Sequence, residues 1–434
     1  MVFDSVLINI IGFTLILLLN LAVKLDKISK FMLYSFQGLW AVILFTTCFK
    51  PYGLYLPSEY CYILLLLNVF CFSLGFSIVK PKSYDFNISN DNVAFISAKK
   101  LVSNKFFLIY LIIITCYIMS LLSVYFAKIA VSNSLGEVRQ DFFYENFYGP
   151  LFTYLDLLFL SPTQIIFLGL GMYCLFRYRT FPVYLMLIYM IIYSTLGAGR
   201  LDYATILMSF IFFAACLTKL NIKRFILISS LSIVVFAVIS YVTNMRGIGE
   251  DNYSEAIVQG VDATIENAVT YSCGAIVAFD HALEDDYVQQ MGGHQYGALT
   301  FAGVVSSVNI IAKRFGESFD EPLSKLVALK QDQRINIGAT NTHNALYTFV
   351  LYPYLDFGIL GVIFIPFFFG IIVRKVISKL YKYRSIWLII LANYCFILMI
   401  NSVLDFRGMY KPTSLLLFTI LFFSDKLFKS RKLV

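Results

Sequence analysis

Apolar runs of about 20 residues recur along almost the whole chain, and each is long enough to cross a bilayer as an α-helix. Strands of a membrane β-barrel would instead read as alternating segments of roughly ten residues. Only 14% of the 434 residues are charged, whereas soluble domains carry roughly 25%. The sequence therefore predicts an all-α fold, a polytopic transmembrane helical bundle.

We place eleven membrane spans, of which the last is the shortest. No small-residue cleavage site follows the first run, so we expect a retained helix rather than a signal peptide. The chain then has three parts: helices 1–8 in residues 1–244, one large loop in 245–352, and helices 9–11 in 353–434. The predicted spans are 3–23, 31–48, 58–79, 106–126, 151–175, 182–198, 202–218, 225–244, 353–373, 385–404 and 412–424.

Lysine and arginine set the orientation, because these residues are enriched in cytoplasmic loops. With the N-terminus outside, the inward connections hold 22 of the 34 Lys and Arg residues. The outward connections hold 12, six of them in the large loop. The C-terminus is then cytoplasmic. The net charge of +8 is explained by this asymmetry, so no nucleic-acid partner is expected.

The large loop carries 13 of the 26 acidic residues and all three histidines. A loop of this length is rarely without structure. Residues 254–284 have apolar positions at helical spacing, and 319–330 is a second helical segment. We expect a mainly helical cap over the outer mouth of the bundle, beside a shorter outward loop at 128–149. No Cys/His spacing resembles a zinc site, and we expect no metal and no cofactor.

Three arginines lie at predicted outer ends of different spans: Arg200 in Gly-Ala-Gly-Arg, Arg246 in Asn-Met-Arg-Gly, and Arg407 in Asp-Phe-Arg-Gly. Positive charge is disfavoured on this side, and the guanidinium fork suits phosphate oxygens. These residues predict a site for an anionic group at membrane level. Alternatively, they reach toward lipid headgroups or pair with Asp202 and Asp405.

Asp156 and Asp356 also fall near outer ends of spans, and we find no charge that must sit at the bilayer midplane. Transporters of charged substrates often place charged groups there. Solvated interfacial carboxylates are the alternative interpretation of both residues.

Two short elements flank the end of the large loop. His343 and Asn344 form a His-Asn pair there, and an Asp-Phe-Gly-x-x-Gly element begins at Asp356. Together with the Gly-Ala-Gly-Arg element at Arg200, they resemble the O-antigen polymerase family (Wzy-type, oligosaccharide repeat unit polymerases). The chain also looks like the related O-antigen ligases, which carry a histidine near the end of a large periplasmic loop.

The resemblance implies a GT-C-like bundle in the bacterial inner membrane with its chemistry at the periplasmic face. Donor and acceptor would be glycan repeat units on undecaprenyl pyrophosphate, and a chain-length regulator would be a partner. Such an enzyme is a membrane glycosyltransferase that uses no nucleotide sugar. The sequence holds no Asp-x-Asp element of the kind that carries a metal in nucleotide-sugar transferases.

A site follows from this chemistry. Arg200, Arg246 and Arg407 would stabilise the pyrophosphate leaving group, and His343 is the candidate general base. A capping or packing role is the alternative for His343. The further candidate substrate-binding residues are Arg139, Arg334, Asn344, Asp356 and Asp156.

Two other functions compete with polymerisation. A ligase that transfers the finished glycan to the lipid A core would share the histidine and the arginines. A flippase or exporter of the lipid-linked unit would more often have short loops and a charged central cavity.

Overall fold

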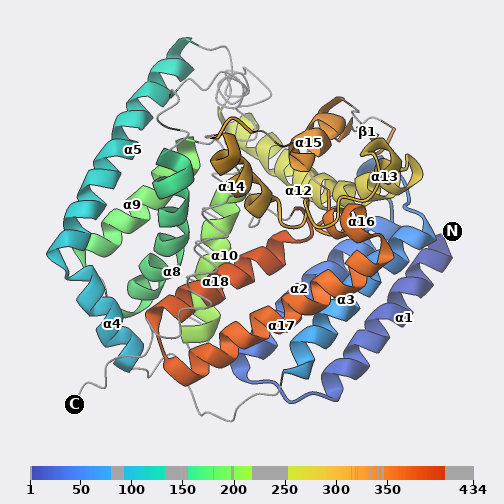
Figure 1. Ribbon diagram of the computed structural model, residues 1–434, viewed down its shortest axis with the longest axis horizontal. Helices are drawn as coiled ribbons and strands as arrows, with labels where there is room; N and C mark the ends of the chain where they lie inside the picture. The colour runs from blue at the N-terminus through green and yellow to red at the C-terminus, as the bar shows by residue number, and fades with distance from the viewer. Residues whose placement is uncertain are drawn as a thin grey trace. The chain divides into compact units, whose positions relative to one another are not determined.

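Figure 1 shows the computed structural model of the chain. The structure describes residues 2–79, 92–131, 148, 152, 155–178, 180–196, 200–217, 253–313, 315–317, 319, 321–332, 335–339, 342–343 and 347–405. The chain forms two compact units. The first comprises residues 1–83, 266–378 and 398–419, and the second comprises 84–265, 379–397 and 420–434.

Six helices in the described part are long and apolar enough to cross a membrane, which confirms a multi-pass, all-α membrane protein. Shorter apolar helices match three further predicted spans. The predicted spans 225–244 and 412–424 lie outside the described residues. The long helices are α1 (Val2–Leu21), α2 (Lys27–Cys48), α3 (Glu59–Ile78), α5 (Lys105–Val131), the helix at Leu158–Arg177, and α17 (Ile359–Tyr383). The shorter ones are α9 (Phe181–Leu196), α10 (Arg200–Leu217) and α18 (Ile386–Asn401).

The first unit packs α1, α2, α3 and α17 side by side (Figure 1). Buried amides and hydroxyls join the first three helices. Asn20 donates to Gln37 (2.7 Å), and Gln37 donates to Ser73 (2.8 Å). Hydrogen bonds between side chains hold helices together where lipid supplies no hydrophobic driving force.

The predicted span 353–373 consists of two helices, α16 (Leu351–Phe357) and α17. Gly358 separates them with φ 61° and ψ −142°. That backbone region is essentially restricted to glycine, so the helix breaks at this residue. The span therefore begins with a separate short helix at its N-terminal end.

The large loop is mainly helical in its described part. The two helical segments predicted from the sequence correspond to α12 (Tyr253–Glu284) and α15 (Pro322–Asp332). The position of these helices as a cap over the bundle stays a prediction. The loop also holds α13 (Tyr287–Gln290), α14 (Ala302–Lys313), and the two-residue strands β1 (Ile335–Asn336) and β2 (Thr342–His343).

The second unit contains α5, α9 and α10, together with α4 (Asn92–Val102) and α8 (Ser161–Arg177). A π-helical turn, η3 (Asp156–Leu160), leads directly into α8. Such turns interrupt α-helices frequently at functional sites. Here the turn contains Asp156, one of the predicted site residues.

Candidate functional site

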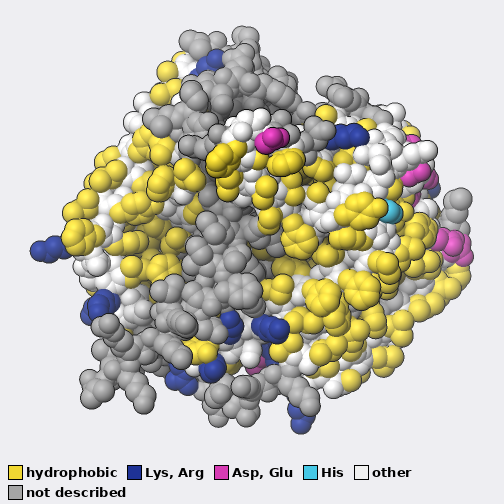
Figure 2. Space-filling view, viewed as in Figure 1, with side chains coloured by type: hydrophobic (Ala, Val, Ile, Leu, Met, Phe, Trp, Pro, Cys, Tyr) yellow, Lys and Arg dark blue, Asp and Glu magenta, His cyan; other side chains and the backbone are white. Residues whose placement is uncertain are grey.

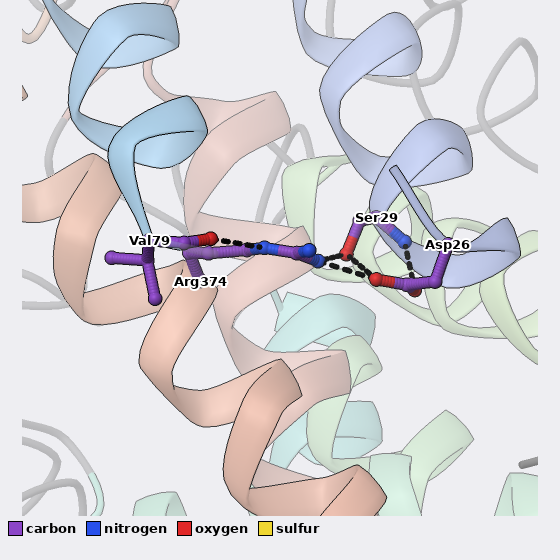
Figure 3. A network of polar contacts seen from close by, with 4 residues as sticks. All are labelled: Asp26, Ser29, Val79 and Arg374. Atoms are coloured by element: carbon purple, nitrogen blue, oxygen red, sulfur yellow. Dashed lines mark hydrogen bonds and ion pairs between the residues drawn. The ribbon is translucent and has the colours of Figure 1, made fainter. Parts of the chain in front are cut away.

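One end of the first unit gathers residues that the sequence predicts on the cytoplasmic side. Arg374 of α17 donates to Asp26 (2.5 Å) and to the hydroxyl of Ser29, and its Nε donates to the carbonyl of Val79 (3.4 Å) (Figure 3). Arg374 is almost fully buried. Its guanidinium therefore ties α17 to the start of α2 and to the end of α3.

A different set of contacts joins the connection between α2 and α3 to the large loop. Asp280 of α12 accepts hydrogen bonds from the backbone amide of Ser58 (2.8 Å) and from its hydroxyl. The amide of Tyr55 donates to the carbonyl of Ile337 (2.8 Å). Both connections are predicted to be outward. In the first unit, residues predicted to be inward thus contact one another, and residues predicted to be outward contact one another. That the outward end faces the periplasm stays a prediction.

A buried charged network lies at the end of the first unit that the sequence predicts to be outward. Lys330 of α15 donates from Nζ to the hydroxyl of Tyr352 (3.1 Å), and that hydroxyl donates to Oδ1 of Asp405 (2.6 Å). Nζ also lies 4.4 Å from the ring centroid of Tyr347 and 4.9 Å from that of Tyr352. We call Lys330, Tyr347, Tyr352 and Asp405 the lysine network. It joins the large loop to the outer end of α18.

Burial lowers the pKa of Lys330 to about 8, and the nearby carboxylate of Asp405 partly opposes this shift. The side chain is only 4% exposed, so little water reaches the ammonium group. Groups whose pKa is shifted by burial next to a charged partner gather at functional sites, which makes the lysine network a candidate site.

The backbone of His343 belongs to a hairpin of β1 and β2 that stands between members of this network in the sequence. The two strands pair antiparallel, with Ile335 opposite His343 and Asn336 opposite Thr342. This hairpin follows Lys330 by five residues and precedes Tyr347 by four. The predicted base therefore stands on a paired segment between two members of the lysine network.

Asp356 holds a turn of the large loop. Its carboxylate is fully buried and accepts the backbone amides of Leu299 (3.1 Å) and Thr300 (2.6 Å). The amides of Gln295 and Tyr296 donate to the backbone carbonyls of residues 355 and 356. The observed role of Asp356 is thus to anchor residues 295–300 to α16, and its predicted contact with substrate stays a prediction.

The glycines of the same Asp-Phe-Gly-x-x-Gly element also have structural reasons. Gly358 adopts the positive φ that breaks the helix. A Cβ atom on Gly361 would overlap the carbonyl oxygen of Pro353. This element, which contributed to the family resemblance, therefore builds the joint between α16 and α17.

The second unit holds the remaining described site residues. The hydroxyl of Tyr193 donates to Asp156 (2.6 Å), joining the end of α9 to the π-helical turn. The hydroxyls of Thr195 and Tyr203 lie 2.7 Å apart. This contact links the two helices on either side of residues 197–199. Arg200 is the first residue of α10.

Several predicted residues cannot be placed within the described part of the chain. The side chains of Arg200 and His343 lie outside it. The convergence of the arginines beside His343 therefore stays a prediction. Also outside the described residues are Arg139, Arg246, Arg334, Asn344 and Arg407.

The lysine network is a candidate site that the sequence did not reveal. Lys330, Tyr352 and Asp405 are separated by 22 and 53 residues along the chain, and no motif connects them. The one sequence feature that could have pointed to Lys330 is its place in a predicted outward loop, where positive charge is disfavoured.

Comparisons with protein families, with curated proteins and with solved structures found no match. Among the described residues, no group of three His, Cys, Asp or Glu side chains could hold a metal ion. The family resemblance stated above therefore rests on the sequence elements alone.

Proposed function

We propose that this protein polymerises glycan repeat units carried on undecaprenyl pyrophosphate, at the periplasmic face of the bacterial inner membrane. The observation that carries the proposal is the lysine network, whose members stand before and after the hairpin of His343 in the chain. The charge distribution of the sequence predicts that this end of the multi-pass bundle faces outward. Arg334 and Asn344 adjoin that hairpin in sequence, and Arg407 follows Asp405 by two residues.

The reaction needs no metal in this scheme. A hydroxyl at the non-reducing end of the incoming unit attacks the anomeric carbon of the growing chain. The bond from that carbon to the pyrophosphate oxygen breaks, and its electron pair leaves with the pyrophosphate. His343 takes the hydroxyl proton as general base. Arg200, Arg246 and Arg407 stabilise the charge that develops on the leaving group.

Lys330 acts as a positioning residue. Lys330 binds Tyr352 of α16, and Tyr352 in turn binds Asp405. The network therefore holds the residues just before the hairpin, and those just before Arg407, against α16. Buried networks of satisfied polar groups rigidify their surroundings. Catalytic groups that are held in the correct geometry raise the reaction rate strongly.

The glycan ladder of a deletion strain tests the proposal. Loss of a polymerase leaves single-repeat surface glycan, whereas loss of a ligase leaves no glycan on lipid A. Loss of a flippase leaves neither single-repeat nor longer glycan on the surface. Single-repeat glycan in the deletion strain, with the full ladder restored by the intact gene, is the expected result.

Single variants in the complementing gene test the residues. We expect Arg200→Ala, Arg246→Ala and His343→Ala to abolish or severely reduce chain extension while the protein remains inserted in the membrane. The matched controls are Arg177→Ala, whose guanidinium stacks on Phe95 in α4, and His281→Ala on α12. Normal extension in both arginine variants would exclude the pyrophosphate site, and normal extension in the histidine variant would exclude the base.

A further inference from the structure

Helix α14 of the large loop exposes large apolar side chains along one face. Figure 2, drawn from the same side as Figure 1, shows hydrophobic side chains on the surface over this helix. We call this set the α14 stripe. Its members are Phe301, Val304, Val308, Ile311 and Phe315, which are 42–81% exposed. Val304, Val308 and Ile311 are four and three residues apart and so share one face of α14, and Phe301 and Phe315 flank the helix on either side.

The protein-facing side of α14 carries polar side chains next to the buried Ala302. Asn309 is buried, and its side-chain amide donates to the carbonyl of Phe319 (3.1 Å) while its oxygen accepts the amide of Phe319 (3.1 Å). Asn309 and Ser306 each donate to Glu321 as well (2.5 and 3.3 Å). A surface helix in water shows the reverse arrangement, with its apolar face toward the core. The exposed face of α14 therefore suits an apolar medium better than water.

The α14 stripe continues into the surface that α17 presents to lipid. Phe301 and Phe357 both approach Gly297, where a Cβ atom would lie 3.5 Å from the first ring and 3.4 Å from the second. From Phe357 the exposed apolar face runs along the spanning helix through Leu360 and Phe364. Because α17 is a membrane span, this face contacts acyl chains, and the stripe extends it onto the loop.

Length and charge indicate how α14 meets the membrane. Its 12 residues cover about 18 Å at 1.5 Å per residue, which is too short to cross a bilayer. Lys313 is exposed at its C-terminal end, followed in sequence by Arg314. Helices with one apolar face and basic residues lie in the plane of the interface and are attracted to anionic lipids.

We propose that α14 is an interfacial helix that docks the large loop onto the outer leaflet of the bilayer, with the α14 stripe among the acyl chains. The proposal does not depend on the chemistry of glycan transfer. It predicts that the loop is held at the membrane surface as well as by Asp280 and Asp356.

Two single-cysteine additions test it in the full chain. Val308→Cys reports the stripe. Val327→Cys is the matched control, because Val327 is also a half-exposed valine on a loop helix, α15 (51% and 41% exposed, respectively). The parent chain, with its eight cysteines, supplies the background. Each protein is placed in lipid nanodiscs of phosphatidylcholine and phosphatidylglycerol, which leave both faces open to reagent.

We expect a membrane-impermeant maleimide to label Val308→Cys at least about tenfold more slowly than Val327→Cys, because an interfacial apolar face lies ~5–10 Å into the headgroup and acyl boundary. A bimane label attached at Val308→Cys in detergent should be quenched after transfer to discs containing brominated phosphatidylcholine. The same label at Val327→Cys should not.

Two outcomes would overturn the proposal. Equal labelling rates would place the stripe in water. Slow labelling of Val308→Cys without quenching by brominated lipid would show that protein covers the stripe, either another segment of this chain or a second copy.

Discussion

Replacing Asp356 with asparagine separates an anchoring role from a substrate-binding role. The carboxylate accepts two backbone amides, from Leu299 and Thr300, and is fully buried. Asparagine offers one acceptor oxygen, and its amino group would face the second backbone donor. At least one charge-assisted hydrogen bond is therefore lost, and the other becomes a neutral one.

The size of the effect follows from typical hydrogen-bond strengths. A hydrogen bond to a charged group contributes ~1.5–3 kcal/mol and a neutral one ~0.5–1.5 kcal/mol. The substitution should cost about 2–4 kcal/mol of local stability. Because each 1.4 kcal/mol is a factor of ten, the two loop amides should exchange roughly 30- to 700-fold faster with solvent.

Hydrogen exchange followed by mass spectrometry measures this directly on the peptide that contains Leu299 and Thr300. Asp285→Asn serves as the control, since Asp285 is an exposed acid in the same loop. Unchanged exchange in Asp356→Asn, combined with loss of chain extension, would refute the anchoring argument and favour contact with substrate. Faster exchange in both variants would show that the effect is not specific to this carboxylate.

Three further substitutions probe the network and the helix joint. Tyr352→Phe removes two hydrogen bonds to charged partners and should lower the melting temperature more than Tyr347→Phe, whose hydroxyl has a neutral partner 3.3 Å away; equal shifts would argue against a charged network. Lys330 has a pKa of about 8 when folded, below the ordinary lysine value of 10.5, so stability should rise by about 3 kcal/mol as pH increases through 8 toward 10.5. Melting curves of Lys330→Met should lack that rise, and an identical pH profile would contradict the assignment. Gly358→Ala forces a side chain into a glycine-only backbone region and should cost ~1–3 kcal/mol; the control Gly38→Ala, with open space around it, should not lower the melting temperature.

Much of the fold could be predicted from local properties of the chain. A segment that crosses lipid must form a helix, because its backbone groups can hydrogen-bond only within the segment, and its side chains must be apolar. Nine predicted spans coincide with described helices. Two helical segments of the loop were also predictable, because helical spacing of apolar residues is a local signal. The break at Gly358 was not predicted, since an apolar run does not reveal a single residue with positive φ.

The composition of the site depended on contacts between distant segments. Lys330 has no sequence feature that marks it as buried, and its pKa is lowered because packing of α15 against α16 removes water from the ammonium group, while Asp405 partly opposes the shift. Asp356 was recognised in a motif, but its partners lie 56 and 57 residues earlier in the chain. The sequence alone was enough to predict the membrane-spanning character and the distribution of charge, because hydropathy and charge are sums over neighbouring residues and need no tertiary contacts. The anchoring role of Asp356 and the desolvation of Lys330 depend on burial and hydrogen bonding. These arise only after distant segments of the chain have packed together.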